Sequence, residues 1–181
     1  MNLPLSGAPP TASACGRLDA AWEVLRQIPD PEVPVISLCE LGIVRDLRLR
    51  EDGIEGLEVV LTPTYSGCPA TELIQDDVRA ALAPFGEVRV TLQRAPAWTT
   101  DWITAEGREK LRAYGIAPPG PVATGSAQPI RLVHRAALTQ LACPRCGSLQ
   151  TEKLSAFGST ACKALYRCLA CREPFEHFKP I

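Results

Sequence analysis

Histidine is scarce in this chain: only two occur in 181 residues, and the first is His134. A serine or cysteine nucleophile in the first two thirds of the chain therefore has no histidine base beside it. The chain has no Glu-x-x-His pair, which carboxylate-bridged di-iron bundles require. It also has no Gly-rich phosphate-binding motif. These absences argue against a hydrolase, a nucleotidase or a di-iron enzyme. We therefore expect that the chain is not itself catalytic.

Long apolar runs are also missing, and no stretch approaches the roughly 18 residues of a membrane-spanning helix. The first residues, MNLPLSGAPPTASACGR, contain neither the basic region nor the apolar region of a secretory signal. We therefore expect a cytoplasmic protein without a membrane partner. In a reducing compartment, clustered cysteines favour metal binding over disulfides. Five of the eight cysteines lie after residue 142.

Charge and composition divide the chain into parts. Residues 1–130 carry a balance of −6 and residues 131–181 a balance of +5, which suggests two units. We expect a disordered tail over 1–16, an α+β domain over 17–116, a Pro/Gly/Ser-rich linker over 117–129 and a four-cysteine metal-binding module over 130–181.

Apolar spacing predicts the elements of the α+β domain. Helices are expected at 18–28, 70–82 and 105–114, a strand hairpin at 43–50 and 57–61, and a third strand at 88–92. Thr104 and Gly115 should cap the last helix. Ser37 and Glu40 have the spacing of a capping box and predict a short helical turn. A small three-stranded sheet with helices follows from this pattern.

The last fifty residues contain the spacing C-x2-C-x21-C-x2-C, formed by Cys143, Cys146, Cys168 and Cys171. Two such pairs can enclose one zinc ion in a tetrahedral four-thiolate shell, with a short β-ribbon between them. A module of this size has a small core, so the metal should contribute folding free energy. Iron is an alternative to zinc at this site, because four thiolates also bind iron. Cys162, the fifth cysteine, is either an extra ligand or a free thiol.

Cys68 is a second candidate site. Pro69 favours the first helical position, which would place Cys68 at the helix cap, where the helix dipole stabilises a thiolate. The same loop offers hydroxyls, and Gly67 leaves room beside the sulfur; the hydroxyls belong to Thr62, Thr64, Tyr65 and Ser66. The alternative is a small buried apolar residue, which is the usual role of a free cysteine.

Three segments carry a family resemblance: DPEVPVISL at 30–38, LGIVRD at 41–46 and LTPTYSGCP at 61–69. They resemble the metal–sulfur cluster biosynthesis family, a domain shared by iron–sulfur assembly factors. WTTDWI at 98–103, YGIAPP at 114–119 and the segment 157–168 are similar to one branch, the D subunits of bacterial phenylacetyl-CoA epoxidase systems. The likeness covers residues 17–181.

The resemblance implies an α+β domain followed by a zinc-ribbon-like tail. It implies an accessory or maturation role for the phenylacetyl-CoA 1,2-epoxidase complex of aerobic phenylacetate catabolism, with the other oxygenase subunits as partners, especially the iron–sulfur reductase. The family's loop cysteine corresponds to Cys68, which would bind a transient iron–sulfur cluster, and its acidic residue corresponds to Glu32. One cysteine supplies only one of the four thiolates that a cluster takes. A second copy of the chain is one possible source of the other ligands, so a homo-oligomer remains an alternative.

Two alternatives remain beside this interpretation. The chain could be a structural, non-catalytic subunit of the oxygenase complex. It could also be a zinc-ribbon protein that binds nucleic acid, which the +5 tail favours. The basic residues near the cysteines are accounted for by compensation of thiolate charge, and no basic stripe with interleaved aromatics is present. We therefore expect no nucleic-acid partner.

Overall fold

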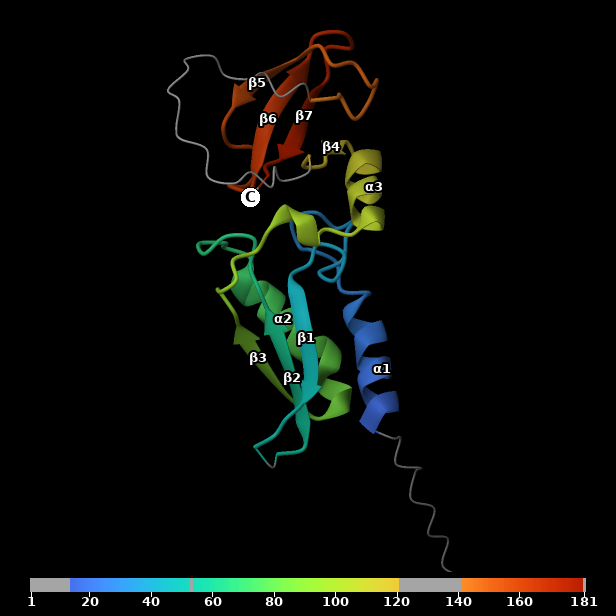
Figure 1. Cartoon of the computed structure of the whole chain (residues 1–181), viewed down its shortest axis with the longest axis vertical. Coiled ribbons are helices and arrows are strands. Elements are labelled where there is room, and N and C mark those ends of the chain that lie inside the picture. The colour runs from blue at the N-terminus through green and yellow to red at the C-terminus, as the bar shows by residue number, and fades with distance from the viewer. Residues whose placement is uncertain (1–13, 53, 121–140, 181) are drawn as a thin grey trace, which may run out of the picture.

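A computed structural model describes residues 14–52, 54–120 and 141–180. Figure 1 shows two units stacked along the long axis of the molecule, with the C-terminal sheet at one end. The predicted tail up to residue 13 and most of the predicted linker lie outside the described residues. Within the described residues, no helix has the length and apolar character needed to cross a bilayer.

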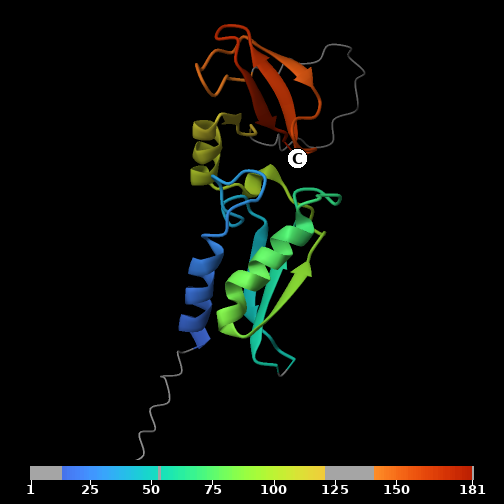
Figure 2. The ribbon, with the colours of Figure 1, turned by 180° about the vertical axis from the view of Figure 1, so that it is seen from behind.

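The first unit is a three-stranded sheet with helices. Its elements are α1 (Ala14–Leu25), β1 (Val44–Leu49), β2 (Gly56–Leu61), α2 (Thr71–Leu82), the 3-10 turn η1 (Ala83–Phe85) and β3 (Glu87–Leu92). The sheet order is β1-β2-β3, with β1 antiparallel and β3 parallel to β2. The parallel pair requires a crossover, which α2 supplies. Figure 2 shows α2 lying across one face of the sheet with α1 beside it.

Most predicted elements of this unit are present, with shifted ends. The helix expected at 18–28 begins at Ala14, so α1 overlaps the end of the tail predicted over 1–16. Cys15 therefore lies in α1. It ends at Leu25, after which Gln27 and Ile28 donate backbone hydrogen bonds to carbonyls three residues back. This tightening is common in the last turn of a helix.

The predicted capping box is formed as a reciprocal pair of hydrogen bonds. The Ser37 backbone N–H donates to Glu40 Oε2 at 2.9 Å, and the Glu40 N–H donates to Ser37 Oγ at 3.2 Å. The segment is a hydrogen-bonded turn and not a helix. Lys110 Nζ lies 2.6 Å from Glu40 Oε1. The turn is thereby connected to the third helix.

The junction between the units consists of the 3-10 turn η2 (Thr100–Trp102) and α3 (Ala105–Tyr114). Thr104 Oγ1 accepts the N–H of Gly107 at 3.0 Å, and Gly115 ends the helix with a left-handed φ of 99°. Both caps agree with the sequence. A Cβ at Gly115 would lie 3.0 Å from Arg145 Nη2 of the second unit. The glycine thus lets the first cysteine turn approach the end of α3.

The second unit is a four-stranded sheet in the order β4-β7-β6-β5. Its strands are β4 (Ile116–Ala117), β5 (Thr151–Ser155), β6 (Lys163–Cys168) and β7 (Pro174–Phe178). The antiparallel pair β5–β6 is the ribbon that the cysteine spacing predicted. The boundary expected between residues 116 and 117 falls inside β4, which pairs in parallel with β7. The end of the first segment therefore forms an edge strand of the second sheet.

The main hydrophobic core contains residues of both units, and a smaller cluster lies within the second unit. Cys162 and Phe178 of the second unit belong to the same buried cluster as Leu25, Leu61 and Val78 of the first. The indole of Trp98 is 3% exposed and donates from Nε1 to the Leu41 carbonyl at 3.0 Å. Burial of this apolar surface stabilises the contact. The second unit is packed on the first.

Candidate functional site

The two C-x2-C turns have the same backbone geometry. The N–H of Cys143 donates to the Ser148 carbonyl at 2.9 Å, and the N–H of Cys168 donates to the Glu173 carbonyl at 3.0 Å. In each turn the residue after the second cysteine is left-handed, at φ 74° for Gly147 and 69° for Arg172. Each turn therefore presents its two sulfurs to the same side.

The four sulfurs of these turns gather into one group. Each ligand atom of Cys143, Cys146, Cys168 and Cys171 lies within 4.8 Å of the others. Cys143 Sγ is 3.8 Å from Cys171 Sγ, and Cys146 Sγ is 3.6 Å from Cys168 Sγ. A regular tetrahedron with Zn–S bonds of about 2.3 Å has edges of about 3.8 Å. The quartet therefore fits a tetrahedral, thiophilic metal ion.

The protein side of this centre favours a thiolate at Cys168. Its side chain is fully buried, and the backbone N–H of Cys171 donates to its sulfur at 3.5 Å. That hydrogen bond is the largest cause of a lowered pKa at Cys168, whereas the neighbouring sulfurs raise the pKa of Cys171. One thiolate in the group is therefore favoured before any metal binds, and the thiolate is the form of cysteine that binds a metal.

Cys162 does not belong to this quartet. It is 6% exposed and lies at the junction of the two units. There it lines a small cavity of about 20 Å³, together with Cys68, Asp30 and Glu32. Thr160 Oγ1 contacts its sulfur at 3.0 Å. The structure thus brings the fifth cysteine to the other candidate thiol, which lies far away along the chain.

Cys68 is not the helix cap that Pro69 suggested. The helix α2 begins at Thr71 with Ala70 as its cap. The Cys68 carbonyl accepts two hydrogen bonds from Thr71, at 3.2 Å from the backbone N–H and 2.8 Å from Oγ1. These bonds close a separate turn before the helix. The prediction that Cys68 caps the helix was therefore wrong, because the cap is Ala70, two residues further along the chain.

The pKa of the Cys68 thiol is raised, not lowered. Burial is the largest cause, and the charge of Glu32 adds to it; the N–H of Ala70 and the side chain of Thr71 act in the opposite direction. Burial likewise raises the pKa of Cys162, against a contact from Thr160. Without a bound cation, both groups are therefore neutral thiols at neutral pH.

Carboxylates accumulate around this cavity. Asp30 is 7% exposed, and its Oδ1 accepts the N–H groups of Glu32 and Val33 at 3.0 and 2.9 Å. Burial raises the pKa of both Asp30 and Glu32, and the charge of Asp30 raises that of Glu32 further. The buried Lys163 of β6 opposes both shifts.

The predicted supporting residues divide between two cavities. Glu32 and Thr64 line the cavity of Cys68. Thr62, Thr64 and Ser66 line a neighbouring one of about 260 Å³ on the Trp98 side of the loop. Thr62 Oγ1 is buried without a hydrogen-bond partner. Gly67 is exposed, and a Cβ there would meet the ring of Tyr65 at 3.9 Å.

Sequence reasoning missed Asp30 and Lys163 as neighbours of the thiols, and it placed Tyr65 beside Cys68 only. The pKa of the Tyr65 phenol is raised by burial and then by Cys68 and Cys162, so the phenol interacts with both thiols. Asp30 lies in a segment that carries the family resemblance, which is the signal that could have found it. Lys163 carried no signal beyond its place next to Cys162.

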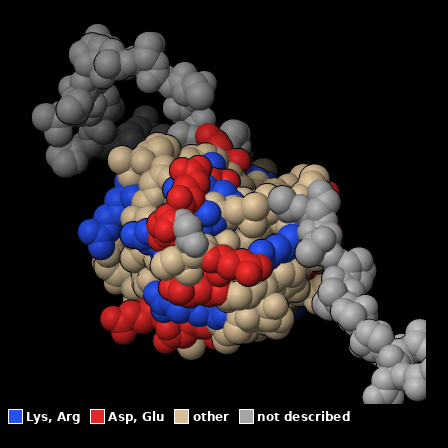
Figure 3. Space-filling model, turned by 90° about the horizontal axis from the view of Figure 1, so that it is seen from below, with Lys and Arg blue, Asp and Glu red and all other residues tan. Residues whose placement is uncertain are grey.

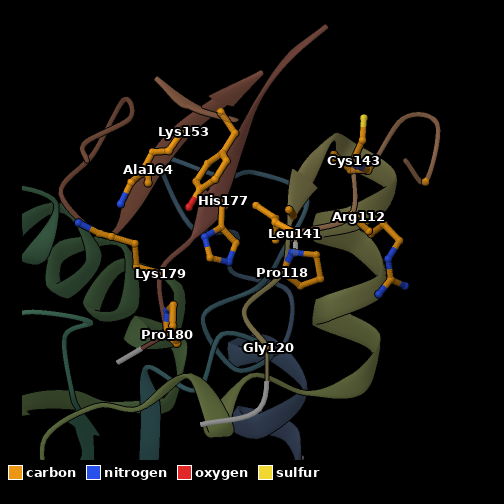
Figure 4. A pocket seen from close by; sticks show the side chains of 15 residues that line it. Arg112, Pro118, Gly120, Leu141, Cys143, Lys153, Ala164, His177, Lys179 and Pro180 are labelled. Atoms are coloured by element: carbon orange, nitrogen blue, oxygen red, sulfur yellow. The ribbon is translucent and has the colours of Figure 1, made fainter. Parts of the chain in front are cut away.

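A larger cavity of about 640 Å³ lies between α3 and the ribbon sheet, where Figure 4 shows Arg112, Lys153, His177 and Lys179 around it. Burial, and then the charge of Lys153, lower the pKa of His177 to about 4. The cavity is bordered by Gly120 and Leu141, next to residues outside the described ranges.

Many of the surface charges of the first unit are paired. Arg50 Nη1 lies 2.6 Å from Glu87 Oε1, and Arg48 Nη2 lies 3.1 Å from Glu58 Oε2. Figure 3 shows Lys and Arg intermixed with Asp and Glu on the face in view. Such a mixed face does not provide the single-sign potential that attracts a nucleic-acid backbone.

Comparison with known families gives two matches along the chain. Residues 18–92, which include Cys68, match the model described as an iron–sulfur cluster assembly protein. Residues 128–179, which include the four-sulfur centre, match the PaaD zinc beta ribbon domain.

Similar proteins span both regions. A protein of Escherichia coli (strain K12), provisionally named as the D subunit of 1,2-phenylacetyl-CoA epoxidase, is 49% identical over 88% of this chain and 91% of its own length. The Fe-S protein maturation auxiliary factor YitW of Bacillus subtilis (strain 168) is 39% identical over 42% of this chain and 76% of its own. A solved DUF59 domain of unknown function from Bacillus anthracis aligns with a TM-score of 0.48 at 23% identity, over 52% of this chain and 91% of that one. The chain belongs to the family of the phenylacetyl-CoA epoxidase D subunits, in which an iron–sulfur assembly domain precedes a zinc ribbon.

Proposed function

We propose that this chain is an accessory maturation protein of a phenylacetyl-CoA 1,2-epoxidase complex in the cytoplasm, and that it carries or transfers an iron–sulfur unit through Cys68. The epoxidase assignment derives from the name of the Escherichia coli relative. The iron–sulfur assignment derives from the family match over residues 18–92 and from relatives named Fe-S maturation factors. The recipient is the iron–sulfur reductase subunit of the complex.

The single observation that carries the proposal is the setting of Cys68. Its sulfur lines a cavity with two carboxylates at the junction of the units, and Ser66 and Gly67 beside it are exposed. A thiol that is half-buried, with a raised pKa, does not hold cargo strongly by its own charge. A weakly held unit can be passed on, which is what a carrier requires.

We further propose that the four-cysteine centre holds zinc and has a structural role. Its sulfur–sulfur distances of 3.6 and 3.8 Å match a tetrahedral ion. All four positions are filled by the protein, so no open position is left for substrate. Zinc bound here would keep β5, β6 and β7 folded and would hold Cys162 at the junction.

The test is anaerobic reconstitution followed by transfer. The zinc-loaded wild type and Cys68→Ala are incubated with iron and sulfide, and the apo reductase is then added. We expect wild type to acquire cluster absorbance and to transfer it to the reductase, whereas Cys68→Ala does neither. Cys39→Ala is the matched control, because Cys39 is also half-buried but does not line the cavity.

Equal loading and transfer by wild type and Cys68→Ala would contradict the proposal. Full activity of an epoxidase complex whose reductase was matured without this chain would support a maturation role. An inactive complex under those conditions, restored by adding this chain after maturation, would instead indicate a structural subunit.

A further inference from the structure

The junction cavity contains thiols from both units. Cys68 lies in the loop before α2, and Cys162 directly precedes β6 of the ribbon. Asp30, Glu32 and Thr64 complete its polar lining, and the rest of the wall is apolar. Two thiols and two carboxylates around one small cavity are the ligand types of borderline divalent metals.

The size of the cavity limits its occupant. Its volume of about 20 Å³ slightly exceeds the roughly 10–15 Å³ that one water molecule requires. One metal ion fits this space, and a multinuclear cluster does not fit without opening of the junction.

The charges around the cavity favour a cation. The charges of Asp30 and Glu176 both act on Glu32, and Lys163 is the basic group that acts on all three carboxylates. Lys163 Nζ lies 2.9 Å from Glu176 Oε2, with only 3% of its side chain exposed. Acidic groups therefore outnumber basic ones around the cavity, which favours a cation over a neutral or anionic occupant.

We propose that Cys68 and Cys162 are the two thiolate ligands of one thiophilic divalent metal ion, such as ferrous iron, with Glu32 as a carboxylate ligand. The inference rests on the proposed function in taking Cys68 as the thiol that holds cargo. It adds that the ribbon supplies a ligand of its own. Binding replaces the two thiol protons, which pass to solvent. The two thiolates then balance the charge of the ion, and the carboxylate leaves a charge of −1 beside the buried Lys163.

The ligands are spaced more loosely than those of the ribbon centre. Among the described residues, the ribbon quartet alone has three or more such ligand atoms mutually within 4.8 Å. Rotation of the Cys68 and Glu32 side chains, both of which are half-buried, would close the junction site around an ion. A site that must be closed by its cargo binds more weakly than a preformed one, as suits an ion destined for transfer.

The test uses Co²⁺ as a spectroscopic probe under anaerobic conditions, in full-length protein whose ribbon already holds zinc. Zinc stays in the ribbon because it binds thiolates more tightly than cobalt does. We expect wild type to bind one further equivalent, with a sulfur-to-cobalt charge-transfer band. Cys68→Ser and Cys162→Ser should each lose about half of that band and weaken binding by more than the roughly tenfold cost of losing an outer-shell contact. Cys39→Ser should match wild type.

A second measurement uses the wild-type protein, so its result does not depend on whether the variants fold. Thiols are alkylated with and without Co²⁺ and are identified by peptide mass spectrometry. The ion should protect Cys68 and Cys162 together and leave the reactivity of Cys39 unchanged.

The outcomes separate this inference from the proposed function. Loss of Co²⁺ binding and of cluster loading in Cys68→Ser, with Cys162→Ser behaving as wild type, overturns the two-thiolate site and leaves the function standing. Wild-type behaviour of both variants overturns both. Joint loss of Co²⁺ binding in the two variants and joint protection of the two thiols support the two-thiolate site, and loss of cluster loading in Cys68→Ser supports the proposed function.

Discussion

The indole of Trp98 and the ring of Phe178 lie with their centroids 5.8 Å apart and their planes tilted by 44°. Trp98 precedes η2 in the first unit, and Phe178 is the last residue of β7 in the ribbon. Both are almost completely buried. The contact joins the two units next to Cys162, whose carbonyl accepts the backbone N–H of Lys179 at 2.9 Å.

Phe178→Ala should separate the two units. Removing a fully buried aromatic ring costs about 3–5 kcal/mol, and here the loss falls on the junction. We expect urea unfolding followed by tryptophan fluorescence to show an early transition that wild type lacks. Phe157→Ala is the control, because that ring is 62% exposed and should cost below about 1 kcal/mol. Equal effects of the two changes would contradict the shared core.

Removal of the ribbon metal should unfold the second unit. Structural zinc contributes an apparent free energy of about 10–16 kcal/mol to comparable small modules, and the second hydrophobic cluster here is small. We expect a chelator to release one zinc per chain, to abolish the sheet signal of β5–β7 in circular dichroism and to make Cys162 reactive. Cys143→Ser should behave like the chelated protein, and Cys15→Ser, with an exposed thiol, like wild type. An unchanged spectrum after complete metal removal would disprove a structural role.

The two cysteine turns should respond in opposite ways to exchange of their left-handed residues. Gly147 adopts φ 74°, and a Cβ there meets nothing within 4 Å, so Gly147→Ala tests backbone strain alone. We expect a loss of about 1 kcal/mol in the free energy of unfolding. Arg172 already carries that strain at φ 69°, so Arg172→Gly should raise stability by up to about 1 kcal/mol. Denaturant titration of the zinc-loaded proteins measures both, and a destabilised Arg172→Gly would show that the guanidinium matters more than the backbone.

Stability should fall as the pH is lowered because of His177. Its pKa is about 4 in the folded chain against 6.5 when free, because burial, and then Lys153, disfavour the charged ring. Between these values the unfolded chain binds the extra proton, so stability rises with pH through this window and is full above it. The effect is at most about 3 kcal/mol, reduced by partial solvent exposure.

The variant His177→Gln isolates this effect, since acid also protonates the ribbon thiolates in both proteins. The stability difference between wild type and variant should change between pH 7.5 and pH 4.5. Lys153→Met should narrow the pH range of this change, because removing the nearby charge brings the pKa of His177 closer to its free value. A difference that is constant with pH would mean that His177 titrates normally.

Local patterns were sufficient for much of the fold. The alternation of residues 43–50, followed by a turn signal and the apolar segment 57–61, predicted the β1–β2 hairpin. Thr104 and Gly115 predicted the caps of α3. These signals depend only on neighbours within a few residues. Local rules failed at Cys68. Pro69 is acceptable at a helix start, but the hydrogen bonds from Thr71 to the Cys68 carbonyl form a turn first. Proline preference alone does not encode that competition.

The sequence by itself determined the ribbon centre, because two thiols separated by two residues are brought to one side by any short turn, and two such turns complete a tetrahedron. Tertiary structure alone decided that Cys162 stands with Cys68 and not with the other four cysteines. That choice depends on the burial of Phe178 against Trp98 and on the pairing of β4 with β7. Both contacts join segments distant along the chain, and they form only because the apolar surface of the ribbon is removed from water against the first unit.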